Sequence, residues 1–340
     1  IRSIVFKMIS VALMFVLVHD TSDYVMYGAI TVFAAVGSNL LNLYKSRSYV
    51  EYRWIGKYNF KQHMKPIFIL FAENLAASIY TNLDTVMLGF MKTDADVGYY
   101  NAAIKVKTIL VSMVTSLGNV LLPRMSYYAK EKKNIEFRKT AQKALNCTMM
   151  IAIPLAIYFS VFSAEAIHFL AGDGYDGAII PMRVITISII PIGLTGILGI
   201  QILTALEKEK YVLYSVITGA IVDFALNLML IPRFGATGAA YGTVIAESCV
   251  LLVQLYYTKE LLIEVKKDFR LNVYLISTWV SVLTAFGIRA LHIQKDILTL
   301  LLSAIVFFGT YMLCVLMYRD PLAMDVIKNI CRKFQNSNVE

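Results

Sequence analysis

The sequence predicts an all-α, polytopic membrane protein with about ten transmembrane helices. Its composition is the first reason, since 58% of the residues are hydrophobic and 16% are charged, whereas soluble domains are roughly 45 to 50% apolar. The second reason is a succession of apolar runs, most of them long enough to cross a hydrocarbon layer of about 30 Å as a helix. Only short polar connections separate these runs, so no soluble domain is expected.

The ten predicted spans follow one another from the first residues onward. They cover residues 3–18, 23–44, 66–90, 97–122, 141–163, 178–205, 209–231, 236–258, 271–289 and 297–318. Lysine and arginine concentrate on every second connection and at both ends of the chain. Because basic loops stay on the cytoplasmic side, this bias predicts cytoplasmic N- and C-termini. The net charge of +9 therefore reflects topology, and no nucleic-acid partner is expected.

The first two spans form a hairpin with a short acidic outer turn. The chain opens inside a span, so we expect it to be the C-terminal part of a longer protein. A basic segment, 45–65, follows the hairpin and carries several tyrosines and a tryptophan. Its composition suits a helix lying at the cytoplasmic interface. It is the clearest domain boundary in the sequence.

The central pair of spans, 66–90 and 97–122, carries ionisable residues inside apolar segments. The first span contains Glu73 and Asp84. The second places polar residues at steps of four and three, which align on one helical face: Asn101, Lys105, Thr108, Ser112, Thr115 and Asn119. Structural hydrogen bonds between helices explain the hydroxyl and amide groups as well as a binding role does. A lysine in mid-span instead indicates a functional site.

A second lysine, Lys107, lies about 200° around the helix from Lys105, since each residue turns by about 100°. We therefore expect only one of them, Lys105, to face the polar cavity.

The fifth span is predicted to break at Pro154. The sixth span carries Arg183 near its outer end, where snorkelling to the interface is an equal alternative to a binding role. Helix breakers and one amide follow it: Pro191, Gly193, Gly196, Gly199 and Gln201.

The seventh and eighth spans carry Asp223 and Glu247. These carboxyl groups could form structural pairs with Lys105 or Lys107, or could bind a proton or a sodium ion. Both interpretations stay open at this point.

The four cysteines show no CxxC spacing and the four histidines form no cluster, so neither a disulfide framework, a metal site nor another cofactor is expected. The last two spans contain almost no charge and are expected outside the polar cavity.

Three stretches carry a family resemblance. They read TNLDTVMLGFMKTDADVGYYNAAIKV, LLPRMSYYAKE and LIPRFGATGAAYGTVIAE, in this order. The sequence resembles the Wzx-type polysaccharide flippases of the MOP transporter superfamily, which also includes MATE multidrug exporters and the lipid II flippase. The resemblance is specific over about 60 to 260 and rests on hydropathy elsewhere.

This resemblance implies a MATE-like two-lobed bundle, of which four N-terminal helices would be absent. On that template the chain comprises the last two helices of the N-terminal lobe (1–44), a cytoplasmic linker (45–65), a six-helix C-terminal lobe (66–258), a cytoplasmic connection (259–270), two additional helices (271–318) and a cytoplasmic tail (319–340).

The function implied is transport rather than enzymatic catalysis. Such a flippase moves an undecaprenyl-diphosphate-linked oligosaccharide across the bacterial plasma membrane by alternating access, for O-antigen, capsule or exopolysaccharide synthesis. Its partners would be this substrate, membrane lipids, and a polysaccharide polymerase with other assembly proteins.

Crossing the membrane with a lipid diphosphate requires cationic groups and sugar-binding hydroxyls or amides. The expected substrate-binding residues are Lys105, Asn101, Thr108, Ser112, Arg124, Arg183 and Gln201, although membrane anchoring explains Arg124 equally well. The expected ion-coupling residues or charge partners are Glu73, Asp84, Asp223 and Glu247.

Three other functions compete with this prediction. A MATE-like exporter of cationic drugs would need an acidic cavity, which the four carboxyl groups could supply but the central lysine disfavours. A lipid II flippase would share the fold. A membrane-embedded polymerase or acyltransferase would need a large outer loop with Arg or His chemistry or a His inside a span, and the sequence offers neither.

Overall fold

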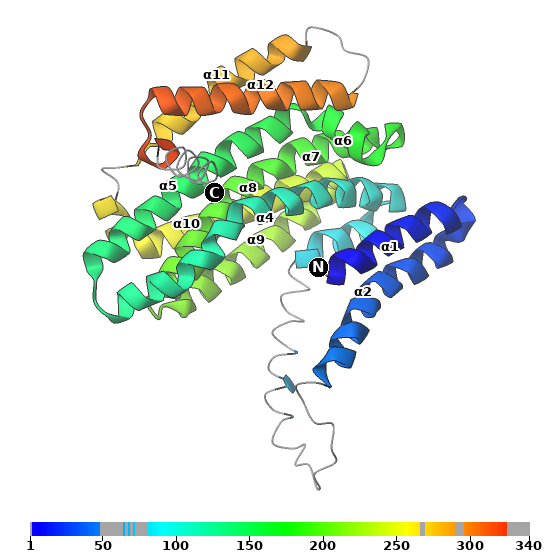
Figure 1. Ribbon diagram of the computed structural model, residues 1–340, viewed down its shortest axis with the longest axis horizontal. Helices are drawn as coiled ribbons and strands as arrows, with labels where there is room; N and C mark the ends of the chain where they lie inside the picture. The colour runs from blue at the N-terminus through cyan, green and yellow to red at the C-terminus, as the bar shows by residue number, and fades with distance from the viewer. Residues whose placement is uncertain are drawn as a thin grey trace, which may run out of the picture. The chain divides into compact units, whose positions relative to one another are not determined.

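The computed structural model describes residues 2–47, 81–265, 269–289 and 296–324, together with residues 64, 67, 68 and 71. Every regular element in these ranges is a helix, which confirms the all-α prediction (Figure 1). Contacts along the chain divide it into two units, Ile1–Ala72 and Glu73–Glu340. The predicted linker 45–65 lies mostly outside the described residues, so the proposed domain division stays a prediction.

The first unit is a helical hairpin of α1 (Arg2–Leu17) and α2 (Tyr24–Ser46), joined through the short 3₁₀ helix η1 (Thr21–Asp23). The Asp23 carboxylate accepts hydrogen bonds from the backbone N–H groups of His19 at 3.0 Å and Asp20 at 3.2 Å. These two bonds close the turn and lower the pKa of Asp23. The predicted N-terminal hairpin is therefore confirmed.

The second unit contains helical residues 81–91 and the elements that follow. They are α4 (Asp94–Lys130), α5 (Asn134–Val161), α6 (Ser163–Ala171), η2 (Asp173–Ala178), α7 (Ile179–Ile185), η3 (Thr186–Ser188), α8 (Ile189–Thr195), η4 (Gly196–Leu203), α9 (Glu209–Phe234), α10 (Ala236–Val265), α11 (Leu271–Arg289) and α12 (Asp296–Met317). These helices lie where the sequence predicts the spans.

Among the described residues, seven helices are long and apolar enough to cross a membrane, or eight if the bent helix α4 counts as one span. The chain is therefore a multi-pass membrane protein. The predicted span 3–18 corresponds to a shorter apolar helix, Ile4–Leu17. The predicted span 66–90 is only partly described.

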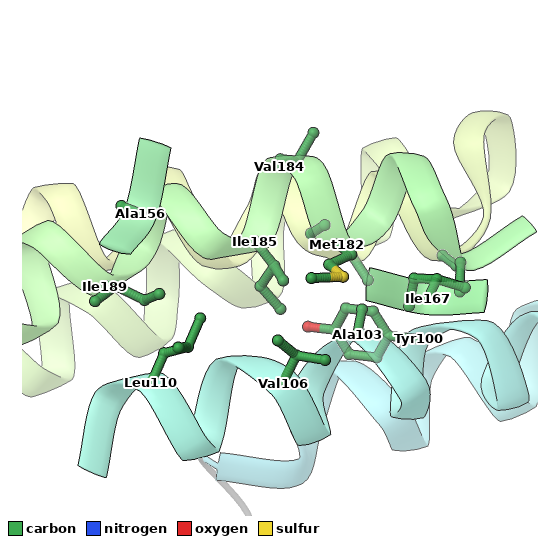
Figure 2. Packing of buried hydrophobic residues seen from close by; sticks show 14 of the residues in the cluster. Tyr100, Ala103, Val106, Leu110, Ala156, Ile167, Met182, Val184, Ile185 and Ile189 are labelled. Atoms are coloured by element: carbon green, nitrogen blue, oxygen red, sulfur yellow. The ribbon is translucent and has the colours of Figure 1, made fainter. Parts of the chain in front are cut away.

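Helix α4 is the central element of the second unit. It begins at an N-cap, where the Thr93 side chain accepts the backbone N–H of Asp96, with acidic residues in its first turn. Figure 2 shows one face of α4 packed against α7 and α8. The α4 residues in this contact recur at three- or four-residue steps, as one helical face requires: Tyr100, Ala103, Val106 and Leu110.

Helix α4 bends by 43° between Asp94–Ser116 and Leu121–Lys130. Pro123 follows the bend inside the helix. A proline ring clashes with the carbonyl four residues earlier and removes a hydrogen bond, which here affects residue 119, within the bend. The bend therefore has a local cause in the sequence.

The prediction that Pro154 breaks the fifth span is wrong, because α5 runs through it without interruption. Pro154 has no N–H group, so the carbonyl of Met150 loses its helical donor. The Tyr311 hydroxyl of α12 donates to that carbonyl at 2.8 Å instead. A side chain distant in sequence thus satisfies the group that the proline leaves open.

The sixth span does depart from α-helical geometry, as its prolines and glycines predict. It contains the 3₁₀ segment η3 and the π-helical segment η4. Gln201 of η4 is 3% exposed and lies against Gly118 of α4, where a Cβ atom would come within 2.0 Å of its amide nitrogen. The opened helix is therefore packed against the bend of α4.

Helices α9 and α10 form a tight hairpin. Gly235 joins them with a φ of +54°, a left-handed conformation that favours glycine. A Cβ atom at Gly238 would lie 2.4 Å from the backbone carbonyl oxygen of Leu230. The two backbones can approach this closely only because this position has no side chain.

Candidate functional site

An acidic cavity of about 280 Å³ lies inside the second unit. Residues 81–91 and helices α4, α8, α9 and α10 form its walls. Its lining includes three acidic side chains, one lysine and three threonines alongside apolar groups. The polar and charged members are Thr81, Asp84, Lys107, Thr108, Asp223, Thr243 and Glu247.

Side chains from three helices hold Asp84 in place. Its carboxylate accepts hydrogen bonds from the Tyr100 hydroxyl at 2.5 Å, the Thr243 hydroxyl at 2.8 Å and the Asn227 amide at 2.8 Å. These donors belong to α4, α10 and α9. Asp84 therefore has a defined position at the junction of the three helices.

Asp223 and Asn227 bring acceptor oxygens without donors to the same region. Both side chains are buried, with exposed fractions of 5% and 0%. In the described part of the chain, the Oδ1 atom of each has no hydrogen-bond partner. Such an unsatisfied buried group costs roughly 1 to 3 kcal/mol. A proton or a cation bound here would remove this cost.

Glycine allows helix α10 to approach these oxygens. A Cβ atom at Gly242 would lie 2.4 Å from Asn227 Oδ1 and 3.5 Å from Asp223 Oδ1. The described residues contain no group of three His, Cys, Asp or Glu side chains able to hold a metal ion. The acceptors near the cavity instead combine carboxylate, amide and hydroxyl oxygens.

A second cavity, of about 420 Å³, lies between α4, α6 and η2. Asn101 and Lys105 of α4 line it together with Tyr175 of η2. The ring of Tyr175 packs edge-on against Tyr99, with ring centroids 5.9 Å apart. Apolar residues of both helices complete the wall. An ammonium, an amide and a phenol beside an apolar surface can bind an oxyanion and neighbouring hydroxyl groups.

The two central lysines point to different cavities, as the helical angle predicts. Lys105 is exposed in the second cavity, whereas the half-buried Lys107 lines the acidic one. The predicted acids Asp84, Asp223 and Glu247 therefore share their cavity with Lys107 and not with Lys105. The remaining predicted acid, Glu73, lies outside the described residues.

The predicted substrate-binding residues do not all come together. Only Asn101 and Lys105 line the second cavity. Thr108 lines the acidic cavity and donates to the carbonyl of Ile104 at 2.9 Å. Ser112 is exposed and donates to the carbonyl of Ile109, its own helix, at 2.6 Å.

The other three predicted residues lie outside both cavities. Arg124 is exposed and donates to the Tyr128 hydroxyl at 3.0 Å, with its guanidinium 5.9 Å from that ring. Arg183 is exposed and lies 3.4 Å from the Ser163 hydroxyl. Gln201 is packed inside the unit.

Sequence reasoning missed two members of the Asp84 network, Tyr100 and Thr243. Thr243 lies one helical turn before Glu247, a spacing that could have indicated a shared face. Tyr100 had no comparable signal, because a tyrosine in an apolar span is common near the membrane interface. Only the packing of α4 against residues 81–91 brings its hydroxyl to Asp84.

Comparisons with known proteins agree with this architecture. The family model described as "Polysaccharide biosynthesis protein" matches residues 1–129, and the one described as "MatE" matches residues 70–229. Among solved structures, the chain is similar to the lipid II flippase MurJ in an inward closed conformation. The TM-score is 0.72 with 18% identity, covering 94% of this chain and 67% of that one.

Two curated relatives cover most of this chain. A protein of Escherichia coli (strain K12), named as a candidate O-antigen transporter, is 24% identical over 258 residues, covering 74% of this chain and 60% of that protein. The probable low-salt glycan biosynthesis flippase Agl15 of Haloferax volcanii is 21% identical over 263 residues, covering 76% and 55%. The match thus spans 60% or less of either relative's length.

Proposed function

Because this chain belongs to the superfamily of membrane transporters that includes polysaccharide flippases and MatE exporters, we propose that it forms part of a flippase for a lipid-linked oligosaccharide. The substrate is an undecaprenyl-diphosphate-linked repeat unit of a surface polysaccharide. The protein carries it from the inner to the outer leaflet of the bacterial plasma membrane by alternating access, without catalysing a reaction. Both ends of this chain are cytoplasmic, in keeping with its basic connections.

One observation carries this proposal: a single membrane helix, α4, lines a cationic cavity on one face and an acidic cavity on another. A lipid diphosphate needs a cation to compensate its charge inside the membrane. An uphill transporter also needs a site for a coupling ion. Because both cavities share α4, a shift of this helix at one cavity alters the other.

On the substrate side, the Lys105 ammonium binds the diphosphate, while Asn101 and Tyr175 bind sugar hydroxyls. Arg124 and Arg183 flank this path towards the cytoplasmic and outer ends and attract the charged headgroup. The hydroxyls of Thr108 and Ser112 and the amide of Gln201 are available to the substrate in other conformations of the cycle.

On the coupling side, Asp84 and Asp223 bind a proton or a sodium ion. Glu247 lines the same cavity, and Glu73 belongs to the same predicted span as Asp84. The unpartnered oxygens of Asp223 and Asn227 support this assignment. Occupancy of the cavity stabilises one conformation of the helices around it, which couples ion binding to substrate movement.

The test is complementation of a flippase-null bacterial strain with the full-length gene product. We expect the wild type to restore surface polysaccharide. We expect Lys105→Ala to reduce export about tenfold or more and to leave lipid-linked oligosaccharide on the inner leaflet, since a charge-assisted contact is worth roughly 1.5 to 3 kcal/mol. Lys105→Arg keeps the charge and retains most export. Equal expression of all variants is the control.

A MatE-like exporter of cationic drugs is the second candidate, and the three acids of the acidic cavity favour it. In that case the wild type would fail to restore polysaccharide and would instead lower sensitivity to cationic dyes. Lys107 within the acidic cavity disfavours an organic cation as the occupant. A lipid II flippase is distinguished by rescue of a strain that lacks peptidoglycan precursor export.

A further inference from the structure

The acidic cavity contains its own cation, Lys107, on the α4 face that carries Ile104, Thr108 and Val111 into the same space. This lysine lines the cavity together with three carboxyl groups, those of Asp84 on residues 81–91, Asp223 on α9 and Glu247 on α10. The cavity thus combines acidic groups from three segments with one basic group from a fourth.

Lys107 shares this space without being paired to any acid. Within the described ranges, it makes no ion pair shorter than 4.0 Å. At the same time, Oδ1 of Asp223 and Oδ1 of Asn227 have no hydrogen-bond donor there. Donor and acceptors are therefore present in one site but are not joined, although a lysine carries three N–H donors on a flexible stem.

We propose that the Lys107 ammonium is a tethered competitor of the coupling cation: it moves onto the Asp223 carboxylate when the cavity is empty and is displaced when a small monovalent cation enters. The inference rests on the proposed coupling role of this cavity. It adds the regulation of that site, because the empty transporter keeps a compensating positive charge instead of exposing buried carboxylates to the membrane interior.

The position of Lys107 on α4 links this exchange to the substrate side. Lys105 and Ile109, two residues away on either side, line the second cavity. Movement of the ammonium towards or away from Asp223 changes the attraction between α4 and α9. The cation therefore alters the wall that the two cavities share, and the lysine sets how tightly that cation binds.

The experiment measures sodium binding by the purified full-length gene product in nanodiscs. The readouts are radiolabelled ²²Na⁺ binding and thermal stabilisation by NaCl, with choline chloride keeping the ionic strength constant. Lys107→Gln should bind Na⁺ about tenfold more tightly than the wild type, because a competing charge that lines the same cavity is removed. Lys107→Arg keeps that charge and should bind no more tightly than the wild type.

Lys130→Gln is the matched control, since it removes a positive charge from an exposed position of the same helix outside the acidic cavity. It should leave Na⁺ affinity unchanged. Asp223→Asn should abolish the Na⁺ response. The proposal is also supported if Na⁺ binds to Lys107→Gln but not to the wild type, because the lysine then excludes the cation from the cavity completely.

The proposal is overturned if Lys107→Gln binds Na⁺ no more tightly than the wild type, or if neither protein responds to Na⁺. Polysaccharide export in the complemented null strain is measured in parallel. If export is restored but Lys107→Gln and the wild type have the same Na⁺ affinity, the competitor role fails and the flippase function stands. If export is not restored, the proposed function fails whatever the binding data show.

Discussion

At the scale of single residues, Pro154 shows how a side chain distant in sequence can replace a missing helical hydrogen-bond donor. The proline deprives the Met150 carbonyl of its helical N–H donor, and the Tyr311 hydroxyl replaces that donor. An unsatisfied carbonyl in an apolar environment is costly, so this bond stabilises α5 where the sequence alone predicts a break. The helix stays continuous because α12 packs beside it.

The first prediction tests this replacement by a double-mutant cycle. Tyr311→Phe should lower the free energy of unfolding by about 1 kcal/mol, because the Met150 carbonyl loses its donor. In a Pro154→Ala background the backbone N–H returns, so Tyr311→Phe should cost much less. Denaturation in detergent measures both values. Equal costs in the two backgrounds would show that the tyrosine acts through packing alone.

At the scale of elements, the α9–α10 hairpin depends on a position without a side chain. Gly238→Ala places a Cβ atom 2.4 Å from the Leu230 carbonyl oxygen, a backbone atom that cannot rotate away. We expect a loss of about 1 to 3 kcal/mol in stability, as for other overpacked sites. Thermal unfolding by size-exclusion chromatography measures it.

Gly309→Ala is the matched control for that substitution. Gly309 also lies inside a helix, α12, but nothing lies within 4 Å of its Cβ position. Alanine favours helix over glycine, so this variant should be as stable as the wild type or slightly more stable. If both glycine variants unfold at the same temperature, close backbone packing does not explain Gly238.

A second contact between elements should depend on pH. His168 of α6 lies 2.8 Å from Asp176 of η2 through Nε2 and 3.0 Å from Asp296 of α12 through Nδ1. The hydrogen bond to Asp176, followed by that to Asp296, raises the pKa of His168. A raised folded-state pKa contributes stability that is fully present below the unfolded value, about 6.5.

This stability is lost as the pH rises through the raised folded-state pKa of His168. His168→Gln should therefore lower the melting temperature relative to the wild type at pH 5.5 and much less at pH 9. The measurement is the difference in melting temperature across that range. A difference that does not change with pH would mean that the imidazole contributes only neutral hydrogen bonds.

At the scale of the whole molecule, the antiparallel pair α11–α12 lies along α5 and α6 (Figure 1). Arg289 of α11 pairs with Glu165 of α6 at 2.9 Å, near the ends of both helices. The Tyr158 hydroxyl of α5 donates to the Leu300 carbonyl of α12 at 2.7 Å. Together with Tyr311, these contacts attach the pair along much of its length.

We therefore predict that α11–α12 and α6 move as one rigid body during transport. Spin labels at the exposed positions 169 and 301, in a variant without native cysteines, should give the same distance distribution with and without NaCl. The control pair, one label at 169 and one at 33 in the first unit, should respond if the units rearrange. A shift within the first pair would contradict the prediction.

The sequence by itself determined the type of the elements and most of their positions. Hydrophobic length, periodicity and alternating charge are local properties, so they identify α2, α9 and α12 without any knowledge of their neighbours. The same reasoning placed Lys105 and Lys107 on opposite faces of α4, because the angle between them depends only on helical geometry.

The tertiary structure alone decided what each face meets. Lys107, not Lys105, lies with the acids because α9 and α10, more than a hundred residues further along, pack on that face of α4. Pro154 fails to break α5 because Tyr311 supplies the missing donor. In both cases the deciding partner is remote in sequence, and hydrogen bonding and charge pairing depend on distances in space that local patterns do not encode.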